Sequence, residues 1–109
     1  MLNTRIESNI MAVYRVTLDI NPASVPINTS AEQTFSLPGL RLNDEIIITK
    51  PTQNAGFVVV QARCSAKDTL AVQFANVTAG ALDMALQTYS LLIFRPDPDR
   101  LNADISASP

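Results

Sequence analysis

Short segments in which apolar and polar residues alternate run along most of this 109-residue chain. The clearest covers residues 14–20, where every even position is apolar and every odd position is polar. This period of two is typical of a strand with one buried and one solvated face. Similar patterns predict further strands over 31–37, 57–64 and 69–75, and apolar, β-branched or aromatic runs predict strands over 45–49 and 88–95. Turn or breaker residues such as Asn21-Pro22 and Pro38-Gly39 separate these segments.

These six segments predict an all-β protein. The strands at 57–64 and 69–75 are close enough in sequence to form a hairpin. The long connections at 21–30 and 76–87 suit strands that cross between two sheets, although 79–87 fits either a short helical segment or a structured loop. We therefore expect an antiparallel two-sheet sandwich, jelly-roll-like, with about seven to eight strands once short edge strands are counted.

The two ends of the chain lack these patterns. We expect an N-terminal arm over 1–12, one β-sandwich domain over 13–95 and a C-terminal tail over 96–109, with both ends flexible. Met11 is an alternative start, which leaves the role of the first ten residues open. Exposed ends are most simply frayed, but isolated apolar side chains also allow them to become ordered against a neighbouring subunit. Those side chains are Leu2, Ile6, Leu101 and Ile105.

Two predicted strands carry more apolar residues than a one-sided sheet needs. In an antiparallel sheet with one solvated face the outward positions are polar, yet Ile47, Leu92 and Phe94 fall on the outward side of their strands. They are covered either by the chain's own loops or by a partner. Burying each such side chain contributes about 1.5–3 kcal/mol, so the second explanation predicts a homo-oligomer, with a dimer favoured over a trimer.

The composition provides few side chains of the kinds that act in catalysis or bind metal ions. The chain has no His and no Trp, and its single cysteine, Cys64, shares a strand phase with Val58, Val60 and Ala62. This phase predicts a buried, inert thiol. The Ser65–Lys67 segment lacks the spacing of a serine-lysine pair. We therefore predict no enzyme activity, no cofactor and no metal site.

Charge and hydropathy exclude two classes of partner. Eight Lys and Arg against ten Asp and Glu give a formal net charge of −2, and no basic cluster is present, so nucleic acid is not expected as a partner. The longest apolar runs fall far short of the roughly 20 residues that span a bilayer. The first 15 residues do not have the pattern of a secretory signal.

The order of several segments between Tyr14 and Arg95 resembles small structural proteins of tailed bacteriophages. The segments that carry this resemblance are Leu18–Val25, Ala31–Phe35, Pro38-Gly39-Leu40, Lys50-Pro51, Ala66–Asn76 and Tyr89–Arg95. Proteins of this kind include capsid decoration proteins, also called cement or staple proteins. The resemblance implies a small jelly roll that binds the outside of the head as an oligomer and bridges neighbouring major capsid proteins.

The resemblance and the apolar excess together predict a virion structural protein, made in the host cytoplasm and assembled on the outer surface of the capsid. Its partners would be the major capsid protein and further copies of itself. The alternative is a receptor- or carbohydrate-binding module of a phage head or tail fibre, which the few aromatic residues disfavour. The candidate oligomer or capsid interface residues are Leu2, Ile6, Ile47, Leu92, Phe94, Leu101 and Ile105.

Overall fold

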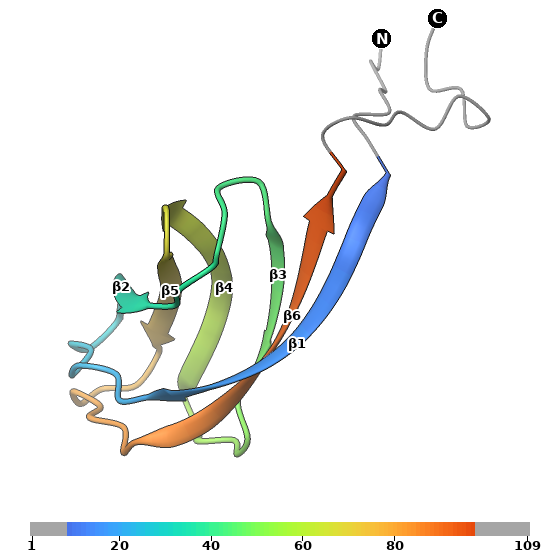
Figure 1. Ribbon diagram of the computed structural model, residues 1–109. Helices are drawn as coiled ribbons and strands as arrows, with labels where there is room; N and C mark the ends of the chain where they lie inside the picture. The colour runs from blue at the N-terminus through green and yellow to red at the C-terminus, as the bar shows by residue number, and fades with distance from the viewer. Residues whose placement is uncertain (1–8, 98–109) are drawn as a thin grey trace, which may run out of the picture.

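The computed structural model describes residues 9–97, which form two antiparallel three-stranded sheets (Figure 1). The first sheet has the strand order β1 (Ile10–Ile20), β6 (Gln87–Pro96), β3 (Glu45–Thr49), and the second has the order β2 (Thr29–Ser36), β5 (Thr69–Asn76), β4 (Phe57–Ala66). The all-β prediction and all six predicted strands are confirmed. The expected seven to eight strands are not found among the described residues, because the long connections contribute only one isolated bridge, Val25 to Leu82.

Four of the five connections cross from one sheet to the other, as predicted for 21–30 and 76–87. The exception is the predicted hairpin of β4 and β5, which pair directly. Residues 79–87 form a loop up to the start of β6 at Gln87, and Asn76 holds this loop. Its buried side-chain amide donates to the Val25 and Gly80 carbonyls at 2.9 and 2.8 Å, and the two long connections are thereby tied together.

The core lies between the two sheets. On β6 the predicted alternation is confirmed, since residues 89, 91 and 93 are buried. Phe74 on β5 is fully buried, stacks on Phe57 with ring centroids 5.3 Å apart and meets Phe35 edge-on at 6.5 Å. The other buried apolar residues of this cluster include Ile20, Val25, Leu40, Leu70 and Val72.

Strand β4 corrects one prediction. Val58 and Val60 were expected on the buried face with Ala62 and Cys64, but both valines are exposed. The pairing of β4 with β5 shifts register between Val59 and Gln61. A bulge of this kind inserts one residue and reverses the alternation beyond it. The face with Ala62 and Cys64 is therefore inward, as predicted, whereas Val58 and Val60 point away from the core.

Hydrogen bonds hold the turn at residues 37–40 in place. Gly39 has a φ of +94°, a conformation that glycine adopts without strain, and the Leu40 N–H donates to the Leu37 carbonyl at 3.2 Å. Asp68, in the β4–β5 turn, accepts a hydrogen bond from the Gly39 N–H at 2.8 Å. The predicted Pro38-Gly39 turn is confirmed, and it is fixed to the second sheet.

Tyr89 is fully buried on β6, and its hydroxyl has no hydrogen-bond partner within residues 9–97. Burial raises the pKa of this hydroxyl. A buried hydroxyl without a partner carries a desolvation cost of about 1–3 kcal/mol. We expect Tyr89→Phe to raise the free energy of unfolding by about 1 kcal/mol, measured by urea denaturation. A lower free energy of unfolding in Tyr89→Phe would show that the Tyr89 hydroxyl does make a hydrogen bond, and would contradict this account.

Candidate interaction surface

A cluster of apolar side chains lies on the outward face of the first sheet. Val13 on β1 pairs directly with Phe94 on β6, and Leu92 pairs with Ile47 on β3. Residues 89, 91 and 93 of β6 point into the core, which leaves Leu92 and Phe94 on the outward face. Val13 and Ile47 are 55% and 54% exposed, Leu92 is 38% exposed, and Phe94 is half-buried. We call these four residues the outer apolar patch.

The other half of the same face is polar. Ser90 on β6 lies between Thr17 on β1 and Thr49 on β3, and Asp19 lies opposite Thr88. The Thr88 hydroxyl donates to Asp19 Oδ1 at 2.6 Å. The outward face therefore divides into a half rich in hydroxyl groups and a half, toward the start of β1 and the end of β6, that holds the outer apolar patch. Two exposed charged residues flank this patch, Arg15 opposite Leu92 and Glu45 opposite Phe94.

The outward face of the second sheet is organised by an ion pair. Arg63 on β4 donates from Nε and Nη2 to the two carboxylate oxygens of Glu32 on β2, each at 2.8 Å. Because β5 lies between these strands, the pair spans the central strand at Ala71, which is fully buried. The hydrogen bond from Arg63 lowers the pKa of the Glu32 carboxyl. The centre of the second sheet is thus covered by the chain itself.

The apolar surface continues from the outer apolar patch toward the second sheet. Strands β3 and β4 are edge strands that lie near each other, and a groove of about 470 Å³ runs between residues 44–48 and 59–63. Ile47 and the exposed Val60 both line this groove. A partner that covers Ile47 would therefore also reach Val60.

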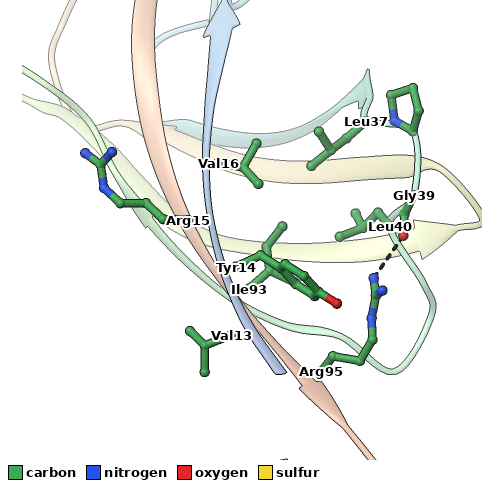
Figure 2. A pocket seen from close by; sticks show the side chains of 10 residues that line it. Val13, Tyr14, Arg15, Val16, Leu37, Gly39, Leu40, Ile93 and Arg95 are labelled. Carbon is green, nitrogen blue, oxygen red and sulfur yellow. Dashed lines mark hydrogen bonds between the residues drawn. The ribbon is translucent and has the colours of Figure 1, made fainter. Parts of the chain in front are cut away.

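Arg95, near the end of β6, ties the loop at 37–44 to the first sheet (Figure 2). Its guanidinium donates to both carboxylate oxygens of Asp44 at 2.9 and 2.8 Å and to the Gly39 carbonyl at 2.9 Å. It also lies over the ring of Tyr14, 5.1 Å from the centroid. A groove of about 490 Å³ opens here between β1 and the turn. The contacts of Arg95 therefore fix the loop at 37–44 against β6 at this end of the sandwich.

The Asp44 carboxylate is the more deeply buried partner, with a side chain only 1% exposed. It accepts a further hydrogen bond from the Arg41 backbone N–H at 3.0 Å. The hydrogen bonds from Arg95 outweigh the effect of burial and hold the pKa of Asp44 below its ordinary value. Both charges are therefore satisfied within the domain.

The structure brings together three of the seven predicted interface residues, because Ile47, Leu92 and Phe94 all belong to the outer apolar patch. The other four, Leu2, Ile6, Leu101 and Ile105, lie outside the described residues. Val13 was missed, since the predicted strand began at Tyr14 whereas β1 begins at Ile10. The pairing of Asp44 with Arg95 was also missed, and their separation of 51 residues leaves no signal in the local pattern.

Cys64 is buried as predicted, and its thiol donates to the Ala66 carbonyl at 2.9 Å. Within residues 9–97 no group of three or more His, Cys, Asp or Glu side chains is placed to hold a metal ion. The same stretch contains no helix long and apolar enough to cross a membrane. Comparison with models of known families, with curated proteins and with solved structures finds no match to this chain.

Proposed function

We propose that this protein decorates the outside of a phage head and stabilises the head by bridging neighbouring major capsid proteins. The outer apolar patch is the surface that meets the shell. The patch is the observation that carries the proposal, because it exposes large side chains on a face that no loop among residues 9–97 covers. A shell offers many equivalent binding sites, so the small contributions of many bound copies sum to a large stabilisation of the head.

The contrast between the two sheets supports this choice of face. The second sheet spans its centre with the Arg63–Glu32 pair and exposes Val58 and Val60 on its edge strand β4. The first sheet exposes Val13, Leu92 and Ile47 across all three of its strands. Removing these side chains from water on binding contributes about 25 cal/mol for each Å² of apolar surface. The sequence resemblance to capsid decoration proteins, which covers strands of both sheets, supports the identity of the partner.

The strand order also supports a jelly-roll-like arrangement. Successive strands alternate between the sheets except at the β4–β5 hairpin, and the orders β1-β6-β3 and β2-β5-β4 interleave the two halves of the chain. Jelly rolls are double-sheet folds in which long connections produce this interleaving, usually with eight strands. We therefore propose a reduced jelly roll with two strands fewer.

A receptor- or carbohydrate-binding module is the second candidate. The observation in its favour is the exposed Tyr14 beside the 490 Å³ groove, because an aromatic ring with a polar edge is suited to amphipathic ligands. Against it, Arg95 lies over that ring and is already bonded to Asp44 and Gly39. Head decoration is therefore the preferred function.

The test compares the two functions directly. Purified protein is incubated with phage heads that lack it and, separately, with a panel of immobilised host glycans. We expect saturable sedimentation of the protein with the heads and no retention on the glycans. Glycan retention without sedimentation would replace head decoration by the second candidate.

A further inference from the structure

Four strands lie at sheet edges, β1 and β3 in the first sheet and β2 and β4 in the second. Proteins protect such edges by keeping them short, by bulges or by charged side chains. β3 has only five residues, and β4 carries two register shifts. β2 has eight residues with one charged side chain, Glu32. Two of the four edges, those of β3 and β4, thus show such a protective feature.

β1 is different, because it is the longest strand and presents a regular edge. It has 11 residues and no proline, and its pairing with β6 is unbroken from Ala12 to Ile20. Among the described residues, β1 makes no backbone hydrogen bonds outside this pairing. The 490 Å³ groove borders it at residues 13–16. Its outer edge is therefore free to pair with another strand.

The side chains of β1 are complementary to a second copy of β1. We propose that two copies pair along this edge as antiparallel strands, with a two-fold axis at Thr17. In this register Arg15 lies opposite Asp19 of the second copy, and the pair occurs twice. On the inward face, the half-buried Val16 lies opposite Leu18, also twice. The charge pairs and the apolar pairs therefore form in the same register.

Opposite charges, paired hydroxyl residues and branched apolar residues that face each other directly across strands are stabilising. Arg15 and Asp19 form no ion pair within the described part of the chain. Arg15 donates to the Ser90 hydroxyl at 3.5 Å, and Asp19 accepts a hydrogen bond from the Thr88 hydroxyl. Moving the axis by one residue would place Arg15 opposite Thr17 or Asn21 and lose both ion pairs. The charges on β1 therefore select the register rather than protect the edge.

Pairing in this way joins two first sheets into one sheet of six strands. A two-fold axis through an antiparallel strand pair, perpendicular to the sheet, leaves both outward faces on the same side. The two outer apolar patches then lie at opposite ends of one continuous face. If the patch binds the capsid as proposed above, the dimer carries two capsid contacts and bridges two subunits. This consequence rests on the proposed function, whereas the dimer itself does not.

The test uses the full chain without heads, so that it is independent of capsid binding. Sedimentation equilibrium should show a dimer, which Arg15→Asp and Asp19→Arg should each weaken at least about tenfold, or about 1.4 kcal/mol. The double variant R15D/D19R should restore the dimer. Lys67→Asp and Asp83→Arg make the same charge changes at exposed sites away from β1 and should leave the dimer unchanged. A monomer at all concentrations, or no loss in R15D, would overturn the proposal.

A cross-link tests the register. Thr17→Cys places two thiols directly opposite each other at the two-fold axis, close enough for a disulfide under mild oxidation. Thr49→Cys, also exposed on the first sheet but on β3, is the matched control and should remain monomeric in denaturing gels. Cross-linking of both variants alike would contradict the β1 pairing. Capsid binding by a monomer would leave the proposed function standing while overturning the dimer.

Discussion

Replacing Ile47 with Asp should weaken attachment of the protein to phage heads at least about a hundredfold. Ile47 is more than half exposed in the outer apolar patch, so the change should leave the fold intact. At the interface it would remove about 1.5–3 kcal/mol of apolar burial and place an unpaired carboxylate against an apolar surface. The two effects together exceed the roughly 2.7 kcal/mol that corresponds to a hundredfold change. Co-sedimentation of each variant with heads measures the effect.

Val58→Asp is the matched control for this variant. Val58 is an apolar residue of β4, 45% exposed on the outward side of the second sheet. Its replacement makes a comparable change on the face that we expect to point away from the shell. V58D should therefore bind like the unmodified protein. Equal loss of binding in V58D and I47D, or normal binding of I47D, would remove the outer apolar patch from the interface.

Replacing Asp44 with Asn should lower the free energy of unfolding by about 3 kcal/mol. The change leaves the largely buried Arg95 guanidinium without its charge partner, and breaking such a pair costs about 3–5 kcal/mol when both groups are fully buried. A domain of this kind has only about 5–15 kcal/mol in total. Urea denaturation at neutral pH measures the loss. A D44N variant as stable as the unmodified protein would show that the pair contributes nothing net.

The second bidentate pair of the protein provides the control. Arg63 and Glu32 have similar geometry, but their side chains are 54% and 33% exposed. Exposed pairs contribute about 0–1 kcal/mol because water screens the charges. Glu32→Gln should therefore change the free energy of unfolding far less than Asp44→Asn does. The difference between the two variants isolates the effect of burial.

The contribution of Asp44 should also depend on pH. Its pKa is lower in the folded protein than the roughly 3.9 of an unperturbed aspartate. The carboxylate therefore stabilises the fold fully above the unfolded value and loses this effect as the pH falls through the folded value. The stability difference between the unmodified protein and D44N should be constant from pH 7 to about 5 and shrink below about 4. A difference that grows on acidification would contradict the assigned pair.

Local patterns in the sequence were sufficient to predict the strands. Period-two alternation located most of them, because each strand of a sandwich has one face in the core, and a β-branched run located the strand at 45–49. The same reasoning found Ile47, Leu92 and Phe94, whose apolar side chains break the expected polar face. It did not find the bulge at Val60, since a run of valines looks the same in either phase. The register of β4 is decided by its pairing with β5 rather than by its own sequence.

Long-range contacts account for what the sequence did not reveal. Asp44 directly precedes β3 and nothing in its local sequence indicates a partner, yet it is the buried partner of Arg95. The antiparallel pairing of β3 with β6, in which Glu45 lies opposite Phe94, brings these two residues together. The sequence also did not indicate how the outward faces of the two sheets differ. In the structure the Arg63–Glu32 pair spans the centre of the second sheet, whereas Leu92 is exposed on the first.

The most direct test of capsid decoration is the number of copies that a head binds at saturation, measured together with the heat resistance of that head. Heads lacking the protein are titrated with it, pelleted and analysed for the ratio of this chain to the major capsid protein. We predict saturation at a fixed small-integer ratio and release of the packaged DNA at a higher temperature than for bare heads. Binding without a defined ratio, or a head that is no more heat-resistant when saturated, would contradict the account.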